Sequence, residues 1–262
     1  MIRALYTAST GMNAEQANID NIANNLANVN TTGFKKTRVE FEDLVYQRTT
    51  VPGTPTSPAT QAPVGLEVGL GTRPVATARD FSPGNLTSTG NPLDIAIQGA
   101  GFLQVQMPDG TIGYTRAGDL HLSGDGTVVT NEGYQILPQM SIPANATAVN
   151  ISNDGIVSIA LQGQSATQQV GTLQLATFQN PAGLDPLGGN IYTATTASGQ
   201  PTTGVPGVNG IGTTQQGFLE DSNVSVVEEM VNMIAGQRAY EANSRVVKAA
   251  DEMLQQVNNL AQ

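Results

Sequence analysis

Residues 2–29 read IRALYTASTGMNAEQANIDNIANNLANV and repeat apolar side chains at alternating intervals of three and four residues. One position of the repeat holds Leu5, Met12, Ile19 and Leu26, and the other holds Ala8, Ile22 and Val29. This spacing is typical of helices that pack along their lengths. We predict a helix over about residues 2–29 that stops near Gly33, which can supply a left-handed residue. Glu15 interrupts the stripe, so it either reaches the rim or pairs with a cation of another helix.

Residues 224–262 carry a second apolar stripe. Its members are Val227, Met230, Val231, Ile234, Val246, Ala250, Met253, Val257 and Leu260. The repeat changes phase between residues 234 and 246. Two caps for this helix are possible, one by Asp221-Ser222-Asn223 and one by Ser225 with Glu228 as a capping box. The members of both stripes are predicted subunit-interface residues, because a pair of helices with these polar outer faces needs further helices to pack against.

A stripe of amides runs beside the first apolar stripe, one residue out of step with it: Asn18, Asn21, Asn25 and Asn28. Each asparagine costs a helix interior up to about 0.7 kcal/mol relative to alanine. The stripe is either a polar face wetted by solvent or a row of hydrogen-bonding groups for neighbouring helices in an assembly. The second interpretation is favoured, and the four residues are predicted interface residues.

Composition excludes several classes of function. The net charge of −10 and the pI near 4.4 argue against nucleic-acid binding, and the absence of cysteine removes thiol catalysis and thiolate metal sites. The one basic cluster, residues 35–38, is interpreted as a solvated or inter-subunit patch. No run approaches the roughly 18 apolar residues of a membrane span, so no direct membrane insertion is expected. The first residues lack the features of a cleaved signal peptide, which predicts that any export is uncleaved.

Two segments of different composition follow the first predicted helix. Residues 34–48 are mixed and predict extended or short helical structure. Residues 51–63 contain Pro52, Pro55, Pro58 and Pro63, which exclude a helix and a central strand. This insert is therefore predicted to be an exposed linker or a polyproline-like arm.

Between about residues 66 and 192, short alternating runs are separated by turn residues. Asp109-Gly110, Asp125-Gly126 and Asp154-Gly155 are strong hairpin signals. Residues 181–216 are rich in Gly, Thr, Pro and Gln and read as loop. The predicted fold class is α+β, with paired N- and C-terminal coiled-coil helices flanking a mainly antiparallel β domain. The predicted divisions are a discontinuous helical part (1–33 and 222–262), a connecting region (34–90) and a β-rich outer domain (91–221).

No set of residues predicts an enzyme. His121 lies in an alternating run and reads as a strand residue facing solvent, and the glycine-rich run 65–71 lacks the context of a phosphate loop. Asn153-Asp154-Gly155 lacks the spaced ligands of a calcium loop and reads as a turn. The sequence therefore predicts no catalytic residue, no cofactor and no metal site.

Three strings resemble one known family. Residues 22–35, IANNLANVNTTGFK, are similar to the N-terminal signature of bacterial flagellar rod and hook proteins. Residues 91–102, NPLDIAIQGAGF, resemble the entry to the β domain of that family. Residues 222–234, SNVSVVEEMVNMI, and 237–243, QRAYEAN, resemble its C-terminal helix.

The resemblance implies a structural subunit of a helical homopolymer, with terminal helices in inner layers and the β domain outside. Such a tube crosses the periplasm as a drive shaft and encloses the export channel. The implied partners are further copies of the chain, the proximal rod, the hook, the outer ring proteins that act as a bushing, and the flagellar type III export apparatus. Chain length and the proline-rich insert are most similar to distal rod members of the family. A proximal rod protein of similar length, a monomeric extracytoplasmic binding module and a cell-wall hydrolase are the alternatives.

Overall fold

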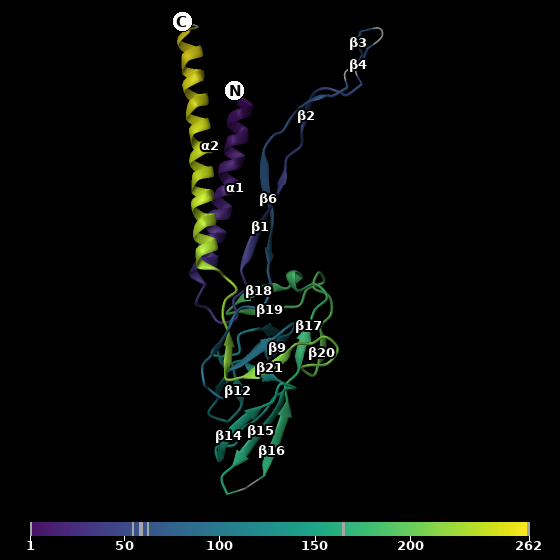
Figure 1. Cartoon of the computed structure of the whole chain (residues 1–262), viewed down its shortest axis with the longest axis vertical. Coiled ribbons are helices and arrows are strands. Elements are labelled where there is room, and N and C mark those ends of the chain that lie inside the picture. The colour runs from purple at the N-terminus through teal and green to yellow at the C-terminus, as the bar shows by residue number, and fades with distance from the viewer. Residues whose placement is uncertain (1, 54, 58–59, 62, 164–165, 261–262) are drawn as a thin grey trace. The chain divides into compact units, whose positions relative to one another are not determined.

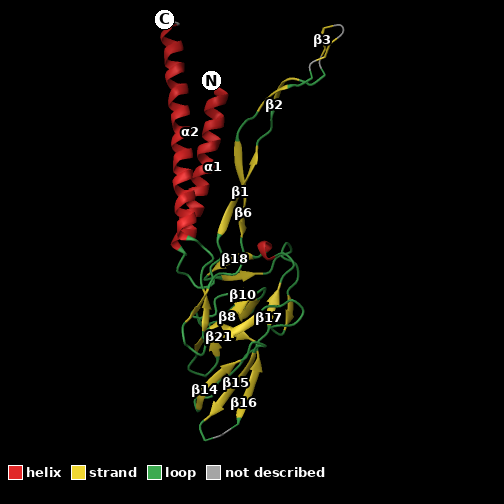
Figure 2. Ribbon diagram, in the orientation of Figure 1, coloured by secondary structure: helices red, strands yellow, loops and turns green. Residues whose placement is uncertain are grey.

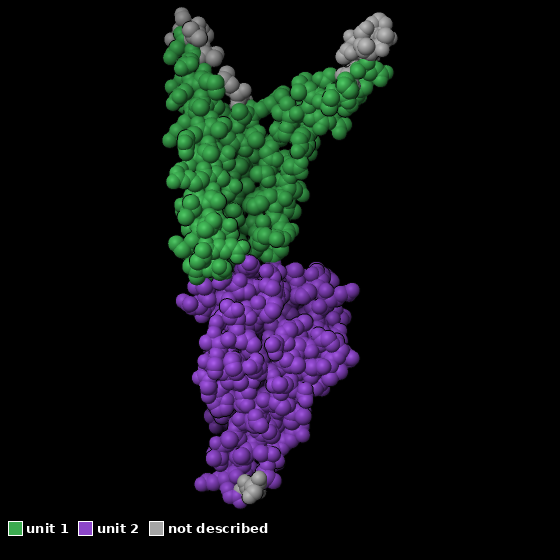
Figure 3. Space-filling view, in the orientation of Figure 1, with its two compact units in different colours: residues 1–26, 37–78, 225–262 green, residues 27–36, 79–224 purple. Residues whose placement is uncertain are grey.

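The computed structural model describes residues 2–53, 55–57, 60–61, 63–163 and 166–260. The chain divides into two compact units (Figure 3), which are described separately below. We call residues 1–26, 37–78 and 225–262 the helix–arm unit, and residues 27–36 and 79–224 the β unit. Among the described residues, no helix is long and apolar enough to cross a membrane.

Two long helices dominate the helix–arm unit (Figures 1 and 2), α1 over Ile2–Ala27 and α2 over Val226–Leu260. Together with the antiparallel strands of the β unit they confirm the predicted fold class. The second predicted cap of α2 is the one used, because the Ser225 Oγ accepts the Glu228 N–H at 3.4 Å. Gly33 does have a positive φ of 69°, but it lies in a turn beyond the end of α1 and does not terminate the helix.

The segment between α1 and the β unit folds back on itself as a two-stranded arm. Strand β1 (Thr37–Asp43) pairs with β6 (Thr72–Arg79), β2 (Gln47–Thr50) with β5 (Leu66–Val68), and β3 (Pro55–Ser57) with β4 (Thr60–Gln61). Within the insert, Pro52 and Pro63 are exposed and Pro55 begins β3, whereas Pro58 lies outside the described residues. The predicted connecting region 34–90 is therefore not one part, because residues 37–78 group with the helices and 79–90 with the β unit.

The β unit is built around a large antiparallel sheet, with strand order β11-β12-β13-β9-β10-β19-β18 and with β17 joining β9 to β20. The members of this sheet are β9 (Phe102–Gln106), β10 (Ile112–Thr115), β11 (His121–Leu122), β12 (Val128–Val129), β13 (Gln135–Leu137), β17 (Leu175–Thr177), β18 (Asp185–Gly188), β19 (Ile191–Thr193) and β20 (Thr202–Gly204). A second sheet contains β14 (Ala146–Ile151), β15 (Ile156–Leu161) and β16 (Thr167–Thr172). Two further pairs join β7 (Leu86–Ser88) to β22 (Phe218–Glu220) and β8 (Ile95–Gln98) to β21 (Thr213–Gln216).

The three predicted Asp-Gly turns are confirmed. Gly110, Gly126 and Gly155 have φ values of 84°, 77° and 76°, and they lie between β9 and β10, β11 and β12, and β14 and β15. His121 lies in β11 and is exposed, as predicted.

The interpretation of residues 181–216 as loop is wrong, because the segment contains β18, β19, β20 and β21. These strands have only three or four residues each, and β19, β20 and β21 pair with strands distant in sequence. For example, Thr213 of β21 faces Gln98 of β8. Short strands with Gly and Thr carry little local signal, so their order comes from tertiary pairing.

The apolar core of the β unit lies between its sheets. The largest cluster joins Ile95, Val105, Leu120 and Ile136 to Val157 and Ile159 of β15. A second cluster stacks aromatic rings edge to face, with Phe102 5.8 Å from Phe178 and 6.2 Å from Tyr192 between ring centroids. This unit therefore has a core of its own that does not depend on the helices.

Candidate assembly surface

The two helices approach closely at two glycines, one on each helix. A Cβ placed on Gly236 of α2 would lie 3.2 Å from Ile19 Cγ1 and 3.4 Å from Glu15 Oε2, both on α1. A Cβ on Gly11 of α1 would lie 2.8 Å from Asn243 Nδ2 of α2. Glu15, the polar interruption of the first stripe, is thus placed against the backbone of α2. In both places a glycine of one helix lies against a side chain of the other.

The first turns of α2 expose a fully apolar surface. We call Val227, Met230, Val231 and Ile234 the α2 patch; their exposed fractions are 74%, 52%, 59% and 56%. Val227 and Ile234 lie nine and two residues before Gly236, which at about 100° per residue places both about half a turn from it. The patch therefore faces away from α1. An exposed apolar patch of this kind marks an interaction surface.

The phase change predicted in this stripe corresponds to two different faces of α2. Ala250 is only 2% exposed, whereas Val246 and Met253 are 46% and 47% exposed. Of the described members in the second half of the stripe, only Ala250 is therefore buried within the chain. Nothing is described for the side chains of Val257 and Leu260.

Most of the first stripe is partly buried within the chain. Ala8 and Ile22 are 5% and 3% exposed, and the remaining members have intermediate exposure: Leu5, Met12, Ile19, Leu26 and Val29. High exposure, which a surface for another chain needs, is therefore found mainly among the stripe members of α2, and the interface role of both stripes stays a prediction.

Two of the four stripe asparagines, Asn21 and Asn25, form hydrogen bonds with Thr37 of β1 in the same chain. Asn25 is buried, accepts the Thr37 N–H at 2.9 Å and donates to the Thr37 carbonyl oxygen at 2.9 Å. Asn21 donates to the same carbonyl oxygen at 2.7 Å. Asn28 accepts a hydrogen bond from the Thr31 hydroxyl at 3.2 Å, and Asn18 is half-buried. The amides at 21 and 25 clamp the base of the arm to α1.

Substituting Asn25→Ala is expected to release this clamp locally. A lost buried hydrogen bond costs about 1–3 kcal/mol, and each 1.4 kcal/mol is a factor of about ten. Amide hydrogen exchange at Thr37 should therefore accelerate by at least about fivefold, measured by NMR or mass spectrometry. Asn13→Ala, at an exposed position of the same helix, is the control. Unchanged exchange at Thr37 in Asn25→Ala would show that the clamp contributes nothing.

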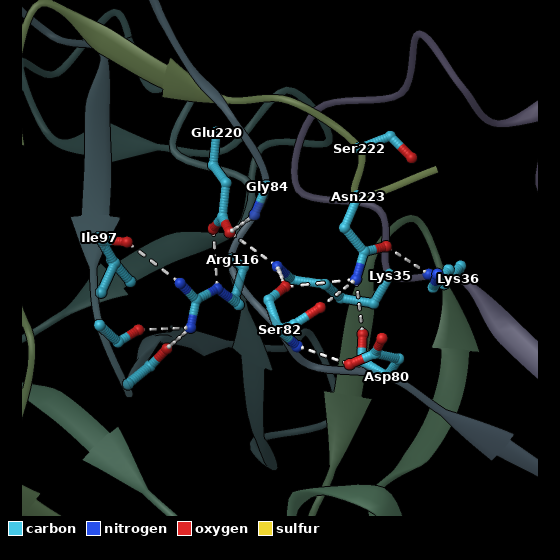
Figure 4. Close-up of polar contacts among 12 residues, drawn as sticks. Lys35, Lys36, Asp80, Ser82, Gly84, Ile97, Arg116, Glu220, Ser222 and Asn223 are labelled. Carbon is cyan, nitrogen blue, oxygen red and sulfur yellow. Dashed lines mark hydrogen bonds and ion pairs between the residues drawn. The ribbon is translucent and has the colours of Figure 1, made fainter. Parts of the chain in front are cut away.

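The β unit contains a buried ionic cluster, which we call the ionic node: Lys35, Arg116 and Glu220 (Figure 4). Lys35 Nζ lies 2.6 Å from Glu220 Oε1, and Arg116 Nε lies 2.8 Å from Glu220 Oε2. The interpretation of residues 35–38 as a solvated or inter-subunit patch is therefore wrong for Lys35, which has no exposed surface. Arg38, in contrast, is exposed and pairs with Glu40 at 3.1 Å.

Backbone groups satisfy the remaining donors and acceptors of the node. Arg116 donates to the carbonyl oxygens of Ile97, Gly99 and Gly101 at 3.0–3.1 Å. Lys35 donates to the carbonyl oxygen of Ser82 at 2.7 Å, and the Gly84 N–H donates to Glu220 at 2.9 Å. A buried charge is tolerated only when it is paired and hydrogen-bonded in this way.

The node shifts the pKa of two of its members. Burial, together with the neighbouring Arg116 charge, lowers the pKa of Lys35. Burial opposes the charged form of Glu220, but the charges and hydrogen bonds of Arg116 and Lys35 outweigh it and lower the pKa of Glu220. The charges and hydrogen bonds of Arg116 and Lys35 thus favour the ionised form of the carboxylate.

The node lies beside the points at which the chain crosses between its units. The crossings fall after residues 26, 36, 78 and 224. Asn223 accepts the Lys36 N–H at 2.7 Å and donates to the Asp80 carbonyl oxygen at 2.9 Å, while the Asp80 N–H donates to the Lys36 carbonyl oxygen at 2.9 Å (Figure 4). Three of the four crossing segments are therefore bonded to one another inside the β unit.

Position 33, just before Lys35 of the node, has room only for a glycine. Its φ of 69° is strained for other residues, and a Cβ would lie 2.8 Å from the backbone of Ala117. Its N–H donates to the Glu220 carbonyl oxygen at 2.8 Å. The string Thr32-Gly33-Phe34-Lys35 is thus a buried connection that leads into the node, which sequence reasoning did not recognise.

Three segments of the chain, from its N-terminal, middle and C-terminal regions, match models of known protein families. Residues 5–35 match the family model described as flagella basal body rod protein, residues 96–159 the flagellar hook protein FlgE/F/G D1 domain, and residues 215–260 the flagellar basal body rod FlgEFG protein C-terminal region. Each member of the node comes from a different matched segment.

Relatives with the printed name flagellar basal-body rod protein FlgG match over the full chain. The chain is 50% identical to that of Buchnera aphidicola subsp. Schizaphis graminum (99% of this chain and 100% of the relative), and 47% identical to that of Borreliella burgdorferi (99% of each). Identity to the Bacillus subtilis protein is 40%, again over 99% of each chain. The chain therefore belongs to the family of flagellar basal-body rod and hook proteins.

Proposed function

We propose that this chain is the subunit of the distal rod of the flagellar basal body. In this role, copies assemble into a helical tube that transmits torque across the periplasm and encloses the export channel. The α2 patch carries the proposal, because four large apolar side chains on one helix face need a partner that the chain itself does not provide. The full-length similarity to rod proteins makes further copies of the chain the natural partner.

The proposed partners follow from this position. Membership of the family implies assembly with other flagellar rod and hook components. More specifically, we propose contact with the proximal rod at one end, the hook at the other and the ring proteins around the shaft. We further propose export through the flagellar type III apparatus without a cleaved signal peptide, and a structural role without catalysis.

Limited proteolysis with mass spectrometry tests whether the helices need an assembly. In dilute purified chain we expect rapid loss of roughly the first 30 and last 35 residues, because the α2 patch has no partner there and chain ends that are not tied down are cleaved first. In isolated basal bodies the same segments should be protected. Helices that are protected in the dilute monomer would instead favour the monomeric binding module.

A complementation experiment distinguishes a distal rod subunit from a proximal rod subunit. The chain, with an epitope in the exposed turn at Gly163, is expressed in a flagellated bacterium that lacks its own matching rod protein. We expect restored swimming and immunogold label on the hook side of the rod in isolated basal bodies. Label confined to the base of the rod would favour the proximal rod protein of similar length, and failure to assemble would contradict both.

The insert 51–63 is proposed to strap adjacent subunits and raise the bending stiffness of the rod. The described part of the arm exposes large apolar side chains, including Val45 (79%), Val51 (54%), Val64 (77%) and Leu66 (57%). A two-stranded ribbon with such a surface is marginally stable alone, so contact with neighbours would stabilise it.

Deletion of residues 51–63 is expected to give rods that assemble but bend more, measured as contour curvature in electron micrographs of isolated basal bodies. Replacing the insert by a Gly/Ser segment of equal length is the matched control. Such a segment is flexible and lacks the side chains of the insert. If side-chain contacts stiffen the rod, rods with this segment should bend as much as rods with the deletion. If only the length of the insert matters, they should be as straight as wild-type rods. Straight, stiff rods after deletion would contradict the proposed role.

A further inference from the structure

The helix–arm unit contains a groove between α1 and the base of the arm. It has a volume of about 590 Å³ and is lined by Ala17, Asp20 and Asn24 of α1, Val39 of β1 and Val75 of β6, among others. Val75 is 54% exposed, so an apolar side chain lies open at its wall. We call this feature the α1 groove.

The groove and the α2 patch face in opposite directions. Glu15 and Ile19 contact α2 at Gly236. Asn24 lies nine residues after Glu15 and five after Ile19, which at about 100° per residue places it about 140–180° from the contact side. The patch is likewise about half a turn from Gly236. The order across the unit is therefore patch, α2, α1, groove.

The two surfaces are of similar length, and both present apolar side chains. Residues 17–24 of α1 and residues 227–234 of α2 each span about 10 Å of helix at about 1.5 Å per residue. The groove offers the apolar side chains of Ala17, Val39 and Val75 beside polar ones such as Asp20 and Asn24, and the patch residues are all apolar. Asp20 lies at the groove, and the exposed Arg238, which is itself paired with Glu241 at 3.4 Å, lies one turn beyond Ile234.

We propose that the α2 patch of one copy docks in the α1 groove of the next copy. This inference rests on the proposed function, since it identifies the contact through which the chain would polymerise. Two different surfaces that face opposite ways make a head-to-tail contact, and such a contact generates an open filament unless its rotation closes a ring. The contact leaves a patch free at one end of the assembly and a groove at the other.

Cysteine cross-linking tests this contact cleanly, because the chain has no cysteine. The double variant Val231→Cys with Val75→Cys is expressed in the complemented strain, and isolated basal bodies are treated with a short bis-maleimide. We expect most of the chain to move from the monomer band to a ladder of dimers, trimers and higher species on a denaturing gel. A second pair, Met230→Cys with Ala17→Cys, covers the case in which the first pair does not assemble.

The matched controls separate this contact from others. Lys248→Cys with Val75→Cys places the α2 cysteine on the same side of the helix but beyond the patch, and we expect no ladder. A ladder equal to that of the test pair would overturn the proposal. Val231→Cys alone should remain monomeric, since dimers would show that patches pair with each other. Rods that assemble and support swimming without a ladder from either test pair would overturn the docking but leave the proposed function intact.

Discussion

Substituting Glu220→Gln is expected to destabilise the β unit by about 3–5 kcal/mol, because it leaves two buried cations without their anion. Lys35 and Arg116 have 0% and 2% of their side-chain surface exposed, so water cannot replace the lost charge. The glutamine amide would also present a donor to a site where Lys35, Arg116 and the Gly84 N–H all donate. Removing one partner of a buried ion pair therefore lowers the free energy of unfolding by far more than the intact pair adds to it.

Urea denaturation of the full chain measures this effect. The chain has no tryptophan, and the buried rings of Tyr114 and Tyr192 make the near-ultraviolet circular dichroism of tyrosine a reporter of the β unit. Glu40→Gln is the matched control, since its pair with Arg38 is exposed and should be worth less than about 1 kcal/mol. A loss for Glu220→Gln no larger than that for Glu40→Gln would show that the node is not a stabilising element.

We also expect the free energy of unfolding of Glu220→Gln to depend on pH differently from that of the wild type. Because the pKa of Glu220 is lowered in the folded chain, its contribution is fully present above the unfolded-state pKa of about 4.3. That contribution is lost as pH falls through the lower folded-state pKa. Glutamine does not titrate, so the stability gap between wild type and Glu220→Gln should narrow as pH falls below about 4. A gap that stays constant over this range would mean that folding does not lower the pKa of Glu220.

The sequence predicted the elements whose signal is local. Apolar periodicity located both helices, and the Asp-Gly pairs located three hairpins. The node could not be predicted in this way, because Lys35 and Glu220 are 185 residues apart and no local pattern indicates that a lysine beside exposed charges will be buried. The signature string around Gly33 was the only available signal, and it marks a family without stating a contact.

The apolar stripe of α2 located the candidate interface residues but not the face that meets α1. In the structure, the face of α2 that meets α1 contains Gly236, which contacts Ile19, and Asn243, which contacts Gly11. An apolar pattern gives no weight to glycine, although glycine permits the closest approach of two helices. The large apolar residues at 227–234 are consequently left for another partner, which is the physical basis of the proposed assembly.

Substituting Ile234→Asp is expected to abolish rod assembly and swimming while leaving the isolated chain folded. Ile234 is 56% exposed and faces away from α1, so the change should alter the free energy of unfolding by no more than about 0.5 kcal/mol. In a packed contact between copies, the carboxylate would lose its water without gaining a partner, which costs at least several kcal/mol.

The defect is repeated at every subunit of a polymer, so even a modest loss per contact prevents growth. Swimming in soft agar and rods in electron micrographs of complemented cells measure the effect, and urea denaturation of the purified variant checks folding. Ile234→Leu is the matched control at the same position and should swim like the wild type, since it keeps an apolar side chain of similar volume. Normal rods with Ile234→Asp would show that the α2 patch remains exposed in the assembly, and an aspartate that unfolds the monomer would show that the patch serves the chain itself. Only a folded chain that cannot assemble identifies the patch as a surface kept apolar for another copy.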